Sequence, residues 1–124
     1  MNTIVIIVLL SGWSSQYDPG VFERVIRNRQ SWGQLPASPP VVDGYVAVED
    51  CSRVGEFIYL KPARQGKWEK FWIVDCAAPP AREWMKRNNI LVEVDSKTVK
   101  RWGYPRGRGI PVEVGKKIRE RCKE

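Results

Sequence analysis

Residues 45–74 read YVAVEDCSRVGEFIYLKPARQGKWEKFWIV, and this stretch decides the fold class. It contains three runs rich in β-branched and aromatic residues, which favour strands: residues 45–49 (YVAVE), 56–61 (EFIYLK) and 68–74 (WEKFWIV). A Gln-Gly pair lies between the second and third runs and is a hairpin signal. The stretch therefore predicts three β-strands, two of them joined as a hairpin.

Two short helices are predicted after this stretch. A Pro-Pro pair opens a helix over residues 81–88, because proline is tolerated in the first turn of a helix. Asp95 is a suitable N-cap for a second helix over residues 97–102, and Gly103 ends it.

The remaining segments complete an all-β fold with small helical content. Residues 90–94 (ILVEV) and 110–114 (IPVEV) are strand candidates, and a first strand is expected near residues 8–16. Residues 21–29 have the apolar spacing of a helix, and the proline-rich residues 30–43 are a surface loop. Six short strands in one domain of 124 residues favour a closed six-stranded β-barrel, because closure removes exposed strand edges.

The two ends of the chain differ in character from the domain between them. Residues 1–10 (MNTIVIIVLL) are almost wholly apolar and are either part of a signal peptide or a first strand. The first alternative implies export to the cell envelope. Residues 11–115 form the predicted barrel domain, and residues 116–124 form a basic tail with a frayed helix as its expected structure.

The charge composition favours some functions and excludes others. The formal net charge is +7, which favours anionic partners such as nucleic acid, cell-wall polymer or a membrane surface, although solubility alone would also explain it. The chain has no histidine, which excludes Ser-His-Asp triads and His-ligated metal sites. Acid–base chemistry must therefore use carboxylates, Lys, Tyr or Cys, and no metal or other cofactor is expected.

The three cysteines, Cys51, Cys76 and Cys122, have no zinc-site spacing. One pair and one remaining cysteine is the natural count for an exported protein. Cys51 and Cys76 each follow an aspartate near a strand end, so we expect these two to form the disulfide. Buried free thiols in a cytosolic protein are the alternative.

Three motifs share their order and spacing with a known family. They are GWSSQY (residues 12–17), WIVDCA (residues 72–77) and LVEVDSKTVKRWG (residues 91–103). The first resembles the Gly-x-Ala-Ser/Thr-x-Tyr opening of rare lipoprotein A-like domains, also called septal-ring lytic transglycosylase-like domains. The second is similar to their Val-x-Asp segment, and the third to an Ile-Ile-Asp-Leu-Ser segment that runs into a short helix ending in Gly.

The resemblance implies a double-psi β-barrel related to barwin and the expansins, with a groove for a glycan strand. It implies two catalytic aspartates, with Asp75 in the Val-x-Asp position and Asp95 as the presumed general acid. Ser15 and Tyr17 match residues of the opening motif that would contact the substrate. The family's Arg and Gly after the first aspartate are here Cys76 and Ala77. Asp95 and Asp75 also have structural readings, as a helix N-cap and a strand-end turn residue.

Six tryptophans supply either core or a stacking surface for sugars. Trp13 lies in the opening motif beside the presumed site and is the best stacking candidate. Trp32 and Trp84 lie in or near loops and could line a groove. Trp102 is expected in the core, and Trp72 is expected to be partly core.

Three functions remain open on the sequence. The first is a peptidoglycan-binding domain with or without lytic transglycosylase activity, and the second is a non-catalytic polysaccharide-binding module of the expansin or barwin type. The third is a basic nucleic-acid-binding barrel, which lacks the interleaved basic and aromatic pattern of such proteins. The expected partner is an anionic cell-wall glycan strand, bound by a monomer without a nucleotide cofactor.

Overall fold

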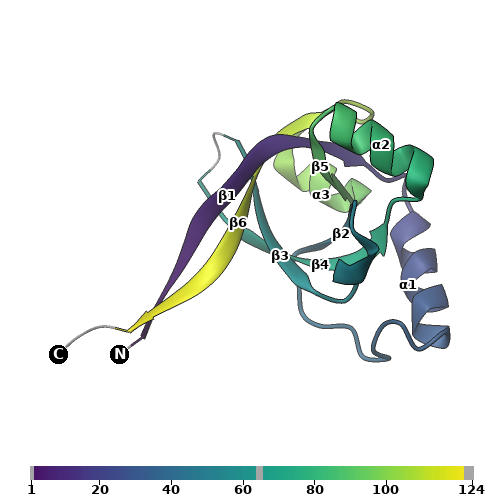
Figure 1. Cartoon of the computed structure of the whole chain (residues 1–124), viewed down its shortest axis with the longest axis horizontal. Coiled ribbons are helices and arrows are strands. Elements are labelled where there is room, and N and C mark those ends of the chain that lie inside the picture. The colour runs from purple at the N-terminus through teal and green to yellow at the C-terminus, as the bar shows by residue number, and fades with distance from the viewer. Residues whose placement is uncertain (1, 64–65, 122–124) are drawn as a thin grey trace.

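The computed structural model describes residues 2–63 and 66–121 and contains six strands and three α-helices (Figure 1). In chain order the elements are β1 (Asn2–Gln16), α1 (Val21–Ser31), β2 (Gly44–Val48), the 3₁₀ helix η1 (Cys51–Arg53), β3 (Phe57–Pro62), β4 (Glu69–Cys76), α2 (Pro79–Arg87), β5 (Ile90–Val94), α3 (Ser96–Trp102) and β6 (Ile110–Arg121). The prediction of a mostly-β fold with six strands in a closed sheet and a few short helices is confirmed.

The strands close into one ring in the order β1-β5-β2-β4-β3-β6. Two neighbouring pairs, β1–β5 and β2–β4, are parallel, and the other four pairs are antiparallel. Advancing every strand by three, so that β1 becomes β4, β2 becomes β5 and β3 becomes β6, returns the same ring with the same pair directions. This twofold topology agrees with the double-psi arrangement that the motifs predict.

The helices obey the same twofold relation. Each half of the chain runs strand, α-helix, strand, short helix, strand, with α1 corresponding to α2 and η1 to α3. An aspartate caps the short helix in both halves: Asp50 accepts a hydrogen bond from the Ser52 N–H, and Asp95 accepts one from the Thr98 N–H. The sequence shows no obvious repeat, so the two halves share their topology and these caps rather than an overall pattern of residues.

Alternating side chains of the strands divide the core into two clusters. Phe71 and Ile73 of β4 belong to a large cluster with apolar side chains of β2, β3, β5, β6 and α3, which fills the inside of the ring. Their neighbours Trp72 and Val74 point the other way and pack under Phe22 of α1. Both tryptophans expected in the core are buried, since Trp72 is 1% exposed and Trp102 is 6% exposed.

Strands β1 and β6 continue beyond the ring as a two-stranded ribbon (Figure 1). Residues 2–10 lie in β1, which agrees with the first-strand alternative for this apolar run. The helix predicted for the basic tail is wrong over residues 116–121, because their backbone groups pair with β1. Residues 122–124, which include Cys122, lie outside the described part of the chain.

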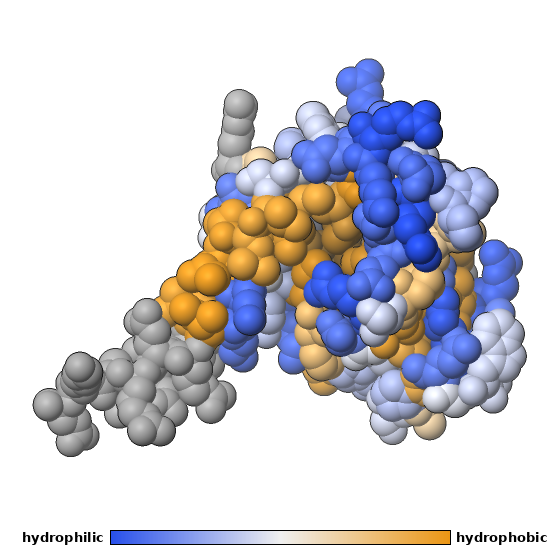
Figure 2. All heavy atoms as spheres, viewed as in Figure 1, coloured by the Kyte–Doolittle hydropathy of each residue, from blue (hydrophilic) through white to orange (hydrophobic). Residues whose placement is uncertain are grey.

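The ribbon has an exposed apolar surface. Ile7, Val8, Leu9 and Leu10 follow one another in β1, and their exposed fractions are between 41% and 54%. They account for part of the apolar surface that extends from the body of the molecule in Figure 2. Among the described residues, no helix has the length and apolar character needed to cross a membrane.

Candidate functional site

Three polar residues lie in one row across four neighbouring strands. Ser15 of β1 pairs with Glu93 of β5, Glu93 pairs with Ala47 of β2, and Ala47 pairs with Asp75 of β4. Residues directly opposite one another on paired strands share a face of the sheet. Ser15, Glu93 and Asp75 therefore project from the same face, with the small Ala47 between the two carboxylates.

This row lies on the outer face of the ring. Ala47 belongs to the core cluster under α1, outside the cluster that fills the ring. The register of β4 against β2 shifts between Val46 and Ala47, and the register of β1 against β5 shifts between Trp13 and Ser14. Such irregularities re-aim the side chains that follow them. The shifts occur in the two equivalent parallel pairs, β2–β4 and β1–β5, and come shortly before Asp75 and Ser15.

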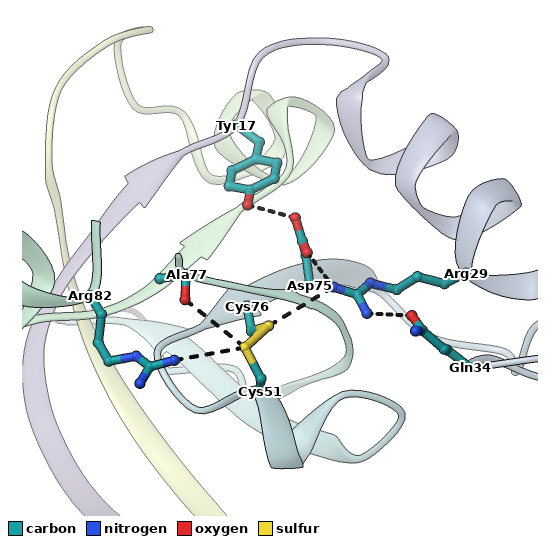
Figure 3. A network of polar contacts seen from close by, with 8 residues as sticks. All are labelled: Tyr17, Arg29, Gln34, Cys51, Asp75, Cys76, Ala77 and Arg82. Carbon is teal, nitrogen blue, oxygen red and sulfur yellow. Dashed lines mark hydrogen bonds and ion pairs between the residues drawn. A yellow bond between two sulfur atoms is a disulfide. The ribbon is translucent and has the colours of Figure 1, made fainter. Parts of the chain in front are cut away.

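Both carboxylate oxygens of Asp75 are occupied (Figure 3). Tyr17 donates its hydroxyl hydrogen to Oδ2 at 2.9 Å, and Arg29 Nη2 of α1 binds Oδ1 at 2.8 Å. Gln34 accepts a hydrogen bond from the other terminal nitrogen of Arg29 at 2.7 Å, which fixes the guanidinium. The Asp75 and Arg29 side chains are each less than one-fifth exposed, so water screens this ion pair less than a surface pair.

Tyr17 is rigidly held beside the acidic row. Its ring stacks on Phe22 with 4.1 Å between centroids and 9° between planes. Burial raises the pKa of Tyr17 far above its ordinary value, and the nearby Asp75 carboxylate raises it further. Tyr17 is therefore a hydrogen-bond donor at neutral pH and not a base.

Glu93 has the perturbed environment typical of a proton-transfer residue. Burial raises the pKa of the half-buried Glu93 carboxyl, the Asp75 charge adds to the rise, and the Ser15 hydroxyl opposes it. The Ser15 Oγ is itself buried. Ser15 and Glu93 thus interact as a pair, in which the carboxyl group holds its proton more tightly than usual.

Asp95 serves as the N-cap of α3 and is not part of this row. The carboxylate accepts hydrogen bonds from the Tyr45 N–H at 3.1 Å and from the N–H and Oγ1 of Thr98 at 3.3 and 2.7 Å. It is 8% exposed and packs so closely on Gly44 that a Cβ there would lie 2.8 Å from Oδ1. The β5 residue aligned with Asp75, across Ala47, is Glu93, and Asp95 is the N-cap of α3.

The predicted disulfide between Cys51 and Cys76 is present, with an S–S distance of 2.05 Å (Figure 3). It ties η1 to the end of β4, immediately after Asp75. A cross-link that closes a loop of this length contributes about 3 kcal/mol in the chain-entropy account. Arg29 Nη2 also lies 3.9 Å from the Cys76 sulfur, so the same guanidinium contacts the disulfide and the carboxylate.

Two neighbouring cavities, together called the groove below, lie near the row; Ser15 lines one of them, and Glu93 and Asp75 line neither. The first, of about 450 Å³, is lined by residues that include Tyr17, Tyr104 and the start of α3. The second, of about 400 Å³, is lined by Ser15 together with Trp84 and Asn88 at the end of α2. Gln16 and Gly107 line both cavities, so the two cavities adjoin at this pair.

The three tryptophans predicted to stack on sugar are placed differently. Trp84 is 46% exposed and lines the second cavity with Ser15. Trp13 is also 46% exposed and lies against Gly109, another residue of that cavity, at 3.4 Å from the position of a Cβ. Trp32, 66% exposed, follows the last turn of α1 and lines neither cavity.

Glu93 and Arg29 are the site residues that the motifs did not indicate. Glu93 is the single polar residue of the run ILVEV, and strand alternation turns it away from the buried Val92 and Val94. That alternation was a usable signal. Arg29 gives no such signal, because one of several arginines on a helix is normally a solvated surface residue.

No protein-family model, curated protein or solved structure matches this chain. Within residues 2–63 and 66–121, no group of three or more Cys, Asp or Glu side chains is arranged to hold a metal ion. The site therefore has to be interpreted from its own geometry.

Proposed function

We propose that the protein binds a cell-wall glycan strand along the groove and cleaves it as a lytic transglycosylase, with Glu93 as the acid–base residue. The observation that carries the proposal is the environment of Glu93. It is half-buried, it is aligned with a second carboxylate, and it pairs in register with a serine that lines the groove. A carboxyl group with a raised pKa is suited to protonate a leaving sugar oxygen near neutral pH.

The proposed reaction uses one carboxyl group twice. Glu93 donates its proton to the glycosidic oxygen as the bond to the anomeric carbon breaks. The Glu93 carboxylate then accepts the proton of the same sugar's 6-hydroxyl, whose oxygen bonds to the anomeric carbon and forms an anhydro end. Glu93 thereby recovers its proton, and no water is consumed. Asp75, held by Tyr17 and Arg29, supplies the negative charge that helps to keep Glu93 protonated.

The family resemblance supports this assignment when its motif is placed on the structure. In Asp-Leu-Ser the Ser stands two residues after the Asp and immediately before a short helix. In this chain the residue immediately before α3 is Asp95, and the residue two positions earlier is Glu93. We therefore propose that Glu93 takes the place of the family's second acid, and that Asp95 takes the place of the capping Ser.

The test is release of anhydro-muropeptides from purified peptidoglycan by the wild type and by Glu93→Gln. The expected result is release by the wild type and a loss of at least about 100-fold in Glu93→Gln, the usual size of a general-acid contribution. Glu83→Gln, on the exposed surface of α2, is the matched control and should retain full activity. Absence of anhydro products from the wild type, or an unimpaired Glu93→Gln, contradicts the catalytic assignment.

A binding module without turnover is the second candidate, and one observation favours it. Both oxygens of Asp75 are already used by Tyr17 and Arg29, so the row offers one carboxyl group for chemistry rather than a pair. Binding of peptidoglycan by both the wild type and Glu93→Gln, with no product from either, would identify this function. A hydrolase is less well supported, because a second free carboxylate would be needed to activate water.

A further inference from the structure

The first cavity of the groove is cationic. Lys97 and Lys100 of α3 and Arg106 of the following loop line it, and Asp18 is the acidic residue among its lining. Asp18 and Arg106 approach to 3.8 Å, but both side chains are at least 75% exposed and such a pair contributes little. Neither Lys97 nor Lys100 forms an ion pair with another described residue. Two lysine charges are therefore available to a ligand in this cavity.

A single loop carries positive charge into both cavities. The loop connecting α3 to β6 contains Arg106, which lines the first cavity, and Arg108, which lines the second. Gln16 of β1 anchors this loop by hydrogen bonds. Its Nε2 donates to the Pro105 carbonyl at 3.0 Å and to the Arg108 carbonyl at 2.6 Å. Its Oε1 accepts from the Gly107 N–H at 3.0 Å. The Gln16 side chain thus orders the loop that places Arg106 at one cavity and Arg108 at the other.

Flat aromatic surfaces accompany these cations. Tyr17 and Tyr104 line the first cavity, and Trp84 lines the second. Aromatic side chains present an apolar face with a polar edge, which suits the faces and hydroxyl groups of sugar rings. Each cavity thus offers an aromatic surface and at least one cation, and this combination fits a linear chain of sugars that carry acidic groups.

We propose that the groove recognises carboxylate groups borne by the glycan strand, with Lys97, Lys100 and Arg106 binding one acidic sugar and Arg108 another. This inference rests on the proposed function and names the substrate class of the same site. Gln16 is the positioning residue, because it orders the loop that carries both arginines. A nucleic acid is the competing anionic strand, and single-stranded DNA tests it directly.

The experiment compares three ligands by titration calorimetry on the full chain. The first is an oligosaccharide of alternating N-acetylglucosamine and N-acetylmuramic acid without peptides, whose lactyl groups are free carboxylates. The second is its methyl ester, which has the same sugars without the charge, and the third is single-stranded DNA of similar length. The wild type should bind the acid at least about tenfold more tightly than the ester and more tightly than DNA.

Two double variants separate a specific site from general charge. Lys97→Gln/Lys100→Gln removes two charges from the first cavity, and Lys116→Gln/Lys117→Gln removes two from exposed positions on the ribbon. The first should lose most of the preference for the acid over the ester, whereas the second should keep it. Arg106→Gln should weaken binding of the acid in the same direction.

The outcomes distinguish this inference from the function on which it rests. Equal binding of acid and ester by the wild type overturns the carboxylate site and leaves glycan binding intact. Equal losses in both double variants also overturn it, since the effect would then be general electrostatic attraction. Failure to bind either oligosaccharide contradicts the proposed function itself, and preferential binding of DNA contradicts both.

Discussion

Glu93 of β5 lies in register with Ser15 of β1, and the Ser15 hydroxyl is buried beside the Glu93 carboxyl group. Burial and the Asp75 charge raise the pKa of Glu93, and the Ser15 hydroxyl partly offsets the rise. Ser15 also lines the second cavity. The two residues come from parallel strands at opposite ends of the sequence, and the ring brings them together.

The raised pKa of Glu93 predicts how stability depends on pH. The folded state binds this proton more tightly than the unfolded state, so the contribution of Glu93 to stability is fully present in acid and is lost as the pH rises through the folded pKa. Glu93→Gln, which cannot ionise, should therefore be more stable than the wild type at about pH 7 and lose that advantage at about pH 4. Urea unfolding at both pH values measures the difference. An advantage for Glu93→Gln that grows in acid would contradict the assigned direction.

Tyr17 should resist ionisation in the folded protein. The chain has four tyrosines, and burial together with Asp75 raises the pKa of Tyr17 well above the ordinary value near 10. Ultraviolet titration of the folded wild type should show one tyrosine fewer ionising near pH 10 than in the denatured chain. Tyr17→Phe should remove that difference, keep the stack on Phe22, and cost about 1 kcal/mol for the lost hydrogen bond to Asp75. An unchanged titration in Tyr17→Phe would show that another tyrosine is the protected one.

Asp95 should matter for stability and much less for chemistry. Asp95→Ala removes an N-cap and leaves the buried Thr98 hydroxyl and Tyr45 N–H without their acceptor, so we expect a loss of about 2–3 kcal/mol in the free energy of unfolding. Asp50→Ala, at the equivalent cap of the other half, is the matched control. It should cost less than about 1 kcal/mol, because its bonds to Ser52 are exposed.

The activity of a second variant, Asp95→Asn, separates the two interpretations of Asp95. Folded Asp95→Asn should retain cleavage of peptidoglycan within about tenfold of the wild type, because the side chain is buried and its oxygens are taken up by Tyr45 and Thr98. A loss as large as that of Glu93→Gln, in a protein shown to be folded by circular dichroism, would return the catalytic role to Asp95.

Gln16→Ala should disorder one loop and leave the ring intact. The variant removes three hydrogen bonds to the segment between α3 and β6, which otherwise consists largely of exposed residues. Amide exchange of Gly107 should accelerate, while the exchange of β5 amides stays slow. Gln16→Glu keeps the acceptor for Gly107 but not the donors, so it should lie between the wild type and Gln16→Ala. Slow exchange of Gly107 in both variants would show that the loop is held by other contacts.

The predictions from local pattern were accurate where a residue's own neighbours decide the outcome. Strand runs such as residues 90–94 alternate visibly, the cap at Asp95 and the stop at Gly103 act within one turn, and both are present. The Cys51–Cys76 disulfide was also predictable, because each cysteine follows an aspartate at a strand end. The basic tail was predicted wrongly because its structure depends on a partner strand more than 100 residues away in the sequence.

The candidate site was only half predictable for the same reason. Asp75, Ser15 and Tyr17 stand in recognisable motifs and do lie together on one side of the ring. Glu93 and Asp95 are two residues apart on the same segment, and motif spacing alone pointed to Asp95, whereas the strand register aligns Glu93 with Asp75. Which of the two faces Asp75 depends on the register between strands, which no local pattern specifies.

The sequence by itself determined the fold class, the absence of histidine chemistry, the disulfide partners and the motifs that locate the site. Only the tertiary structure decided that Glu93 and Ser15 are in register, that Arg29 binds Asp75, and that Gln16 lines both cavities. The physical reason is that hydrophobic alternation and capping act over a few residues, whereas the charges and cavities of a site depend on pairings between strands from distant parts of the chain.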